Sequence, residues 1–227
     1  MKKEKLTALR AVVLNVCLYL GFGVSFGILI DLFVGPARLP LSVLLESIGR
    51  GSVVLCLVIM TRQSYSITFA EMGLKYRGLW QDILYGALLG ASLSLVAGLL
   101  SDVMGPMLPE WGKVPQRYDF VALYRSSQGA WRAILLFVFI VSTSIIEEIF
   151  YRGIVQSVLR RAFSFLATLL LSSGLFGLFH VYPELAIPAF VIGCGLTLLR
   201  EWRKSLVGPI TAHATGNCLA LIFSDSG

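Results

Sequence analysis

Charged residues are scarce in this sequence. Only 14% of its 227 residues are Asp, Glu, Lys or Arg, whereas 56% are hydrophobic, and the mean hydropathy is +0.80. Soluble domains carry about 25% charged and about 45–50% apolar residues. The scarcity of charge therefore excludes an ordinary soluble domain and indicates a polytopic membrane protein whose outer surface is covered by lipid.

Several common sequence signatures are also missing. The four cysteines form no CxxC or CxxH pair, which argues against a disulfide framework or a cysteine zinc site and predicts small, buried packing residues. These cysteines are Cys17, Cys56, Cys194 and Cys218. There is no P-loop, no GxGxxG and no inverted repeat of the kind that marks many transporters. The net charge of +6 lies mainly at the N-terminus and in loops that can face anionic lipid, so we expect no nucleic-acid partner.

Seven apolar stretches approach the roughly 20 residues that a membrane span needs. The predicted spans are residues 9–34, 42–61, 82–104, 131–155, 163–180, 185–199 and 206–223. The first apolar run is too long for a cleaved signal peptide, so we expect a retained span. The expected fold class is an all-α, polytopic transmembrane helix bundle that forms a single integral membrane domain over residues 1–227. Its first three spans and an outer loop occupy 1–129, and a motif-bearing core of four spans occupies 130–227.

Basic residues cluster beside alternate spans and predict the orientation. The clusters are Lys2, Lys3, Lys5 and Arg10; Arg62, Lys75 and Arg77; Arg160 and Arg161; and Arg200, Arg203 and Lys204. With seven spans all four clusters fall on one side, which predicts a cytoplasmic N-terminus. The opposite loop also holds Lys113, Arg117 and Arg125, so the bias is clear without being absolute. The small size, with no eukaryotic extension, favours a prokaryotic plasma membrane.

Glu46 and Arg50 interrupt the second predicted span and are four residues apart. Side chains at this spacing lie on one face of a helix, where opposite charges can neutralise each other. The simplest interpretation is therefore a structural ion pair, near an interface or facing the bundle. A catalytic role for this pair is the alternative.

Glu147 and Glu148 are adjacent within the fourth predicted span, in the run AILLFVFIVSTSIIEEIFYRG. A carboxylate at bilayer depth costs roughly 2.5–3.5 kcal/mol, so two neighbouring ones need a compensating reason. In the pattern EExxxR, Arg152 follows Glu148 by four residues and can neutralise its carboxylate. Glu147 is then left on an adjacent face of the helix.

The two histidines of the sequence also fall in apolar segments, and each belongs to a four-residue pattern. In FxxxH, Phe176 lies one helical turn before His180 and can pack against its ring. In HxxxN, His213 and Asn217 share one face of the last span. Each pattern alone also fits a structural role, such as an interfacial histidine or a hydrogen bond between helices. Together with the adjacent carboxylates, they favour a common reactive site.

These residue types are the ones that hydrolysis by water requires. A carboxylate can act as general base toward water and then as general acid toward the leaving group, and a histidine can help to position that water. An asparagine amide and a histidine N–H one turn apart can donate to a developing oxyanion. Ser142, Thr143 and Ser144 have no neighbouring base in the sequence, and Cys218 is expected on another helix face than Asn217. Water is therefore the expected nucleophile.

The ordered motifs EExxxR, FxxxH and HxxxN on successive hydrophobic segments resemble the CPBP family. This family comprises CAAX prenyl-endopeptidases of the Ras-converting type and the bacterial Abi or bacteriocin-processing proteins, and it is described as glutamate-dependent intramembrane proteases. The resemblance covers roughly residues 130–223, with every motif position intact. It implies an intramembrane endopeptidase that acts on a membrane-associated, leader or prenylated peptide. It further implies that Glu147 and His180 activate water, that His213 and Asn217 form the oxyanion hole, and that Glu148, Arg152 and Phe176 support them.

Other functions and cofactors stay open at the level of the sequence. Two histidines and one or two glutamates would suffice for zinc, but HExxH is absent and the histidines are on different spans, so we expect no metal and keep zinc as the alternative. A non-enzymatic immunity or scaffold protein of the same fold, or a small transporter, are the rival functions. A peptide or protein substrate and the lipid bilayer are the expected partners, and the sequence does not indicate an oligomeric state.

The depths of the predicted site residues present a difficulty. With seven straight spans, Glu147 lies near the middle of the fourth span and His180 toward the outer end of the fifth, while His213 is about two turns into the seventh from the inside. These side chains can converge only if the helices tilt, or if the fourth helix extends well past Arg152.

Overall fold

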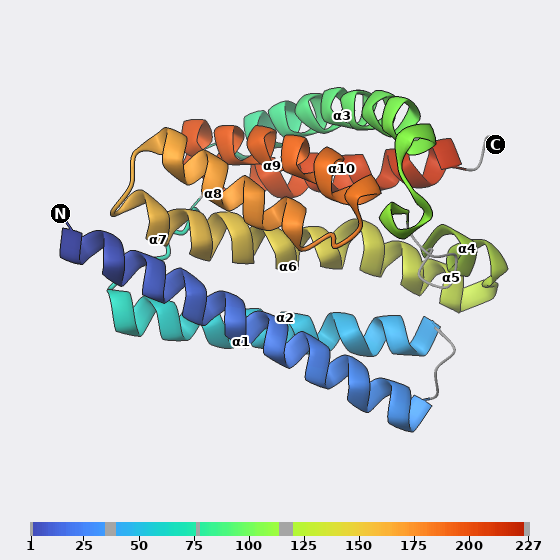
Figure 1. Cartoon of the computed structure of the whole chain (residues 1–227), viewed down its shortest axis with the longest axis horizontal. Helices are drawn as coiled ribbons and strands as arrows, with labels where there is room; N and C mark the ends of the chain where they lie inside the picture. The colour runs from blue at the N-terminus through green and yellow to red at the C-terminus, as the bar shows by residue number, and fades with distance from the viewer. Residues whose placement is uncertain (1, 35–39, 76–77, 114–119, 225–227) are drawn as a thin grey trace.

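The computed structural model describes residues 2–34, 40–75, 78–113 and 120–224, and over these residues the protein is an all-α bundle without strands (Figure 1). The first half comprises α1 (Lys2–Val34), α2 (Pro40–Tyr65), α3 (Leu79–Met104), the short turns η1 (Gly105–Met107) and η2 (Glu110–Gly112), and α4 (Phe120–Ser126). One long helix follows, made of α5 (Gly129–Leu136), η4 (Phe137–Ser142), α6 (Thr143–Glu148), η5 (Ile149–Val155) and α7 (Gln156–Arg160). The chain ends with α8 (Phe165–Leu178), α9 (Pro183–Arg203) and α10 (Val207–Ser224).

All seven predicted spans are helical, which confirms the polytopic fold class. Among the residues that the structure describes, five helical segments are long and apolar enough to cross a membrane: Glu4–Gly23, Pro40–Tyr65, Leu79–Met107, Gly129–Arg160 and Pro183–Arg203. The other two, Phe165–Leu178 and Val207–Phe223, are shorter apolar helices. Helix α8 has 14 residues and is therefore about 21 Å long, which is less than the roughly 30 Å of a hydrocarbon core. In Figure 1 the turn from α8 to α9 stops short of the end that α5 reaches.

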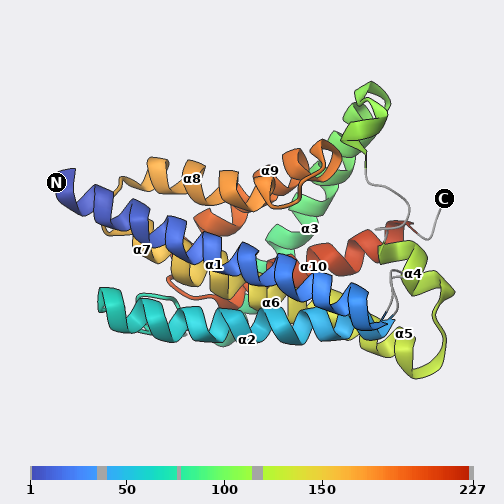
Figure 2. The ribbon, with the colours of Figure 1, turned by 60° about the horizontal axis from the view of Figure 1, so that its bottom comes forward.

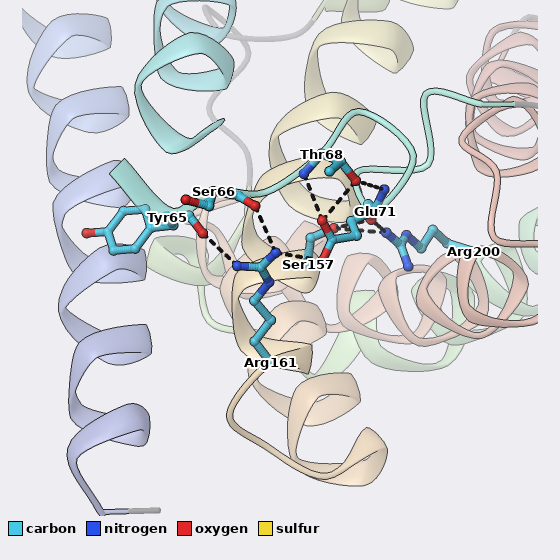
Figure 3. Close-up of polar contacts among 7 residues, drawn as sticks. All are labelled: Tyr65, Ser66, Thr68, Glu71, Ser157, Arg161 and Arg200. Carbon is cyan, nitrogen blue, oxygen red and sulfur yellow. Dashed lines mark hydrogen bonds and ion pairs between the residues drawn. The ribbon is translucent and has the colours of Figure 1, made fainter. Parts of the chain in front are cut away.

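The loop after α2 is fixed to the ends of the neighbouring helices (Figure 3). The Arg161 guanidinium donates to the Tyr65 carbonyl oxygen at 2.6 Å and to the Glu71 carboxylate at 2.6 Å. The Ser157 hydroxyl donates to the Glu71 carbonyl oxygen at 2.8 Å, and the Arg200 guanidinium donates to the same oxygen. The connections that follow α2, α7 and α9 therefore meet at one end of the bundle.

The N-terminus lies at this same end, where the Lys5 ammonium is 5.8 Å from the Phe163 ring centre. The basic clusters predicted from the sequence thus share one end of the molecule, as the orientation argument requires. Arg77 and the side chains of Lys2 and Lys3 lie outside the described residues. That this end faces the cytoplasm stays a prediction.

A capping box stabilises the loop after α2. The Thr68 amide donates to the Glu71 carboxylate at 2.8 Å, and the Glu71 amide donates to the Thr68 hydroxyl at 3.2 Å. The hydrogen bond from the Thr68 backbone amide, followed by the one from Arg161, lowers the pKa of Glu71 from 4.5 to about 2. Because the folded-state pKa is below the ordinary value, this stabilisation is complete above pH 4.5 and is lost as the pH falls toward 2.

Replacing Glu71 with glutamine is expected to remove this pH dependence. The loss of stability at neutral pH should stay below about 1 kcal/mol, because both Glu71 and Arg161 are partly exposed to solvent. Thermal unfolding of both proteins between pH 7 and pH 3 measures the effect. The wild type should lose its advantage over Glu71→Gln as the pH falls, and a constant difference would contradict the assignment.

Small residues on α3 allow close contact with α10. A Cβ atom at Gly90 would lie 2.3 Å from the Ala212 carbonyl oxygen and 2.9 Å from its Cα. Backbone atoms cannot move aside as a flexible side chain can, so only glycine fits this position. Two turns further along α3, Gly98 has no atom within 4 Å of the corresponding Cβ position.

The two glycines therefore provide a matched pair of substitutions. Gly90→Ala is expected to destabilise the protein by about 1–3 kcal/mol, because α10 must shift away from α3. Gly98→Ala should leave stability unchanged or raise it by up to about 1 kcal/mol, because alanine favours helix more than glycine does. Unfolding by SDS titration in mixed micelles measures both, and similar values for the two variants would show that the close contact has no such effect.

Two predictions about individual side chains are wrong. Cys17 and Cys56 are exposed, because the outer helix surface is covered by lipid in the membrane and needs no protein neighbour. No ion pair joins Glu46 to Arg50 among the described residues, although both side chains line the same cavity. Helical spacing made that pair possible, but contacts with other helices decide where each side chain points.

Candidate active site

Glu147 and Glu148 lie on α6, between two π-helical segments of the same long helix. π-Helical turns are rare and occur frequently at functional sites. In the first of them, η4, the Phe139 carbonyl oxygen accepts a hydrogen bond of 2.8 Å from the Asn217 amide. The helix thus departs from regular α geometry on both sides of the glutamates, and one departure brings it into contact with α10.

The Glu148 carboxylate is fully buried and is shared by two partners. The Arg152 guanidinium donates to its Oε1 atom at 2.8 Å, and His213 Nδ1 lies 2.9 Å from the same oxygen. Arg152 also donates to the Gly193 carbonyl oxygen at 3.3 Å and lies over the Phe176 ring at 4.5 Å. The predicted ion pair between Glu148 and Arg152 is confirmed, and it extends to a histidine 65 residues away in the sequence.

His213 lies between the two glutamates. Glu148 Oε1 already accepts from Arg152, so the proton of the hydrogen bond to His213 is on His213 Nδ1. The other ring nitrogen, Nε2, is 4.0 Å from Glu147 Oε2. Nε2 therefore faces the carboxylate that the sequence left without a partner on its own helix.

His180 is positioned by Phe176, one turn earlier on α8. Its Nδ1 lies 2.8 Å from the Phe176 carbonyl oxygen, and because a carbonyl only accepts, Nδ1 is the donor. The Nε2 atom of the neutral ring then keeps its lone pair and can act as a base. The Phe176 ring centre is 5.0 Å from that of His180 and 5.8 Å from that of His213, so the predicted packing of FxxxH is confirmed.

A tight turn follows His180. Val181 has a φ of +60°, which is rare for a β-branched residue, and the Tyr182 amide donates to the His180 carbonyl oxygen at 2.6 Å. Helix α9 begins immediately afterwards at Pro183. A strained backbone next to a predicted site residue is typical of positions whose geometry is fixed for function.

Two cavities of similar size share His180 in their lining. The α2 cavity has a volume of about 400 Å³ and is lined by Tyr19, Leu20, Phe22, Gly23, Glu46, Arg50, Val53, Glu147, Tyr151, Phe179 and His180. The α3 cavity has a volume of about 420 Å³, and its lining, mainly from α3, α9 and α10, includes Ser94, Phe139, Phe176, His180, His213 and Asn217. Glu147 therefore faces one cavity, His213 and Asn217 face the other, and His180 stands at their boundary.

The seven residues predicted from the motifs are thus gathered around Phe176 and His180. Asn217 lines the α3 cavity with Phe176, His180 and His213; its amide donates to Phe139 and lies 3.5 Å from the Ser144 hydroxyl. Two features bring the site residues to similar depths in the bundle. The long helix continues to Arg160, eight residues beyond Arg152, and α8 already ends at Leu178.

Sequence reasoning missed two residues of the α2 cavity. Tyr19 on α1 gives no signal in the sequence, since one tyrosine in an apolar span is unremarkable. Arg50 on α2 was noticed as a charge within a span but was interpreted as the partner of Glu46. Figure 2 shows that α1 and α2 lie alongside the long helix that carries the glutamates. Residues of these two helices can therefore line the cavity that Glu147 faces.

The donor set does not fit zinc as it stands. Within the described part of the chain, no three side chains of His, Cys, Asp or Glu are grouped so that they could hold one metal ion. The Glu148 oxygen that would be the natural ligand is bound instead to the Arg152 guanidinium and His213.

Comparison with known proteins identifies the part of the chain that carries this site. No curated protein and no solved structure matches the chain. Residues 129–219, about two fifths of the sequence, match the Rce1-like family, described as type II CAAX prenyl endopeptidase Rce1-like. All seven motif residues fall within the matched region. This part of the chain is thus similar to type II CAAX prenyl endopeptidases, in agreement with the resemblance that the three motifs carry.

Proposed function

We propose that this protein is an integral membrane endopeptidase that hydrolyses a peptide bond with water activated by Glu147 and His180. The observation that carries the proposal is the arrangement around His180. The Glu147 carboxylate faces the α2 cavity, two potential oxyanion donors face the α3 cavity, and His180 borders both. A peptide bond placed at this boundary would have a base on one side and hydrogen-bond donors on the other.

In the first step Glu147 accepts a proton from water while the water oxygen attacks the peptide carbonyl carbon. The lone pair of His180 Nε2 accepts a hydrogen bond from the same water and aligns it. The C–N bond then breaks, and the proton on Glu147 is transferred to the leaving nitrogen. This sequence follows the usual alternation of one group between general base and general acid.

The negative charge on the carbonyl oxygen needs donors, and we assign this role to His213 and Asn217, which line the α3 cavity. His213 Nδ1 is committed to Glu148, so donation from Nε2 requires a second proton on the ring. The carboxylates of Glu148 at 2.9 Å and Glu147 at 4.0 Å face the resulting charge. One N–H of the Asn217 amide donates to Phe139, and the other makes only a long contact of 3.5 Å to Ser144, so this second N–H can donate to the oxyanion.

The substrate is a membrane-associated peptide, a leader peptide or a prenylated peptide. The family match supports a peptide substrate and a lipid environment. We further propose a prokaryotic plasma membrane as the location, with the basic end of the bundle in the cytoplasm. The first three spans and the motif-bearing core form one integral domain, because α1 and α2 complete the wall of the α2 cavity.

Cleavage of a peptide library by the purified full-length protein tests this function. The reaction is run in ¹⁸O-labelled water, with and without a chelator, and with Glu147→Ala as the inactive control. Products that carry one ¹⁸O in the new carboxylate, are absent with Glu147→Ala and are unaffected by the chelator would support the proposal. Loss with the chelator and recovery with zinc would overturn the metal-free mechanism. Full biological activity of Glu147→Ala would favour a non-enzymatic protein instead, and solute flux in proteoliposomes a transporter.

A further inference from the structure

The α2 cavity contains a cation that the proposed chemistry does not use. Arg50 lines this cavity together with Glu147 and His180. None of the ion pairs among the described residues involves Arg50. Ionisable residues within a membrane span are rare, and they usually pair with each other or mark a binding or transport path. Arg50 has no such ion pair in the part of the chain that the structure describes and lines the same cavity as the proposed catalytic carboxylate of Glu147, which suggests that it binds a ligand.

Arg50 is also far from both ends of its helix. It is the eleventh of the 26 residues of α2, so at 1.5 Å per residue it lies about 15 Å from one end and about 22 Å from the other. Arginines that reach the lipid headgroups usually lie near helix ends. Its position therefore points to a partner inside the cavity.

Neighbouring helices hold Arg50 in place opposite Glu147. The Tyr19 hydroxyl interacts with the Arg50 guanidinium and is close to the Glu147 carboxylate. The Tyr19 ring is fixed by stacking on Phe150, with ring centres 4.3 Å apart. On the other side of Arg50, the residue that follows it, Gly51, packs near the Ile146 side chain just before Glu147. Residues of α1, α2 and α6 thus lie around the part of the cavity that Arg50 and Glu147 share.

We propose that Arg50 binds a carboxylate of the substrate in the α2 cavity and so makes the enzyme selective for anionic peptides. This inference rests on the proposed function and specifies its substrate class. A guanidinium can hold a carboxylate by two parallel hydrogen bonds, and a mostly apolar lining strengthens them. Glu46 and Glu147 also face this cavity, so the binding carboxylate must lie on the α2 side, away from Glu147. Two sources have this chemistry: the C-terminus of the peptide and an Asp or Glu side chain within it.

A binding experiment that does not depend on hydrolysis tests the proposal. The full-length protein in phosphatidylcholine nanodiscs is titrated with dansyl-Leu-Leu-Leu that ends in a free carboxylate or in a carboxamide. A second pair, dansyl-Leu-Glu-Leu-amide and dansyl-Leu-Gln-Leu-amide, places the charge within the chain. We expect the wild type to bind the anionic member of at least one pair about tenfold or more tightly. The pair that shows the preference identifies the source of the carboxylate.

Variants of Arg50 separate a charge contact from a structural role. Arg50→Gln should bind both members of the selective pair equally, and Arg50→Lys should keep part of the preference. The matched control is Arg62→Gln, since Arg62 is an exposed arginine on the same helix that lies 4.1 Å over the Phe69 ring. This control should keep the full preference.

Four other outcomes contradict the proposal, and a fifth contradicts only the proposed function. Equal binding of both members of each pair by the wild type would show that no carboxylate is recognised. A preference that survives Arg50→Gln would place recognition elsewhere, and an equal loss for both members would make Arg50 structural. If phosphatidylglycerol in the nanodiscs competes with the peptides only when Arg50 is present, while no peptide preference exists, Arg50 binds lipid instead. A protein that shows the preference but cleaves no peptide would overturn the proposed function and leave the carboxylate site intact.

Discussion

Hydrolysis by a Glu147→Gln variant is expected to be about 10²–10⁴-fold slower than hydrolysis by the wild type, because this is the usual contribution of a general base. Glutamine has nearly the same shape as glutamate but cannot take a proton from water. The Glu147 side chain is 16% exposed and lines the α2 cavity, and its carboxylate lies 4.0 Å from His213 Nε2. Its removal breaks no short hydrogen bond among the described residues, so thermal unfolding should stay within about 0.5 kcal/mol of the wild type.

Glu46 provides the matched control for this experiment. It is a second carboxylate on the wall of the same cavity, but on α2 and outside the three motifs. Glu46→Gln should therefore keep the rate of hydrolysis within a few fold of the wild type. Initial rates and unfolding midpoints are measured on both variants with one substrate from the library. Equal losses of rate would mean that the charge of the cavity matters more than the position of the base.

The sequence was sufficient to predict the spans and two contacts between residues four positions apart. Spans are set by long apolar runs, and all seven of them are helices. The contacts between Glu148 and Arg152 and between Phe176 and His180 join residues four positions apart, which a helix places on one face. Such contacts are local, so they can be predicted without knowledge of the tertiary fold.

Features that depend on packing between helices could not be predicted from the sequence. The hydrogen bond between Glu148 and His213 joins α6 to α10, and the one between Asn217 and Phe139 requires a π-helical turn. The same spacing argument that succeeded for Arg152 failed for Glu46 and Arg50. There, both side chains line a cavity that is also lined by neighbouring helices, and they do not pair with each other. Spacing defines which contacts are possible, and the tertiary fold decides which of them form.

The α1 and α2 helices show a second limit of sequence comparison. The family match begins at residue 129, yet Tyr19 and Arg50 line the cavity that Glu147 faces. The matched region therefore contains all the motif residues without the opposite wall of the α2 cavity. If substrates differ among proteins with the same core, this wall is where we expect the difference to arise.

Replacing Arg152 with methionine is expected to destabilise the protein by about 3–5 kcal/mol, because it leaves a buried carboxylate without its main partner. The side chains of Arg152 and Glu148 are both fully buried, and their ion pair is 2.8 Å long. Methionine keeps much of the aliphatic volume against Phe176, so the loss reports on charge more than on packing. Unfolding by SDS titration in mixed micelles measures the change.

Arg161 shows what the same change does at an exposed site. Its ion pair with Glu71 is 2.6 Å long, but the two side chains are 41% and 44% exposed, so Arg161→Met should cost no more than about 1 kcal/mol from this pair.

A double variant, Glu148→Gln with Arg152→Met, removes both buried charges and should be more stable than Arg152→Met alone. If the double variant were the less stable of the two, the cost would come from lost packing or from the lost bond to His213. The contact with α10, and not the ion pair with Arg152, would then be the main difference between Glu148 and Glu147.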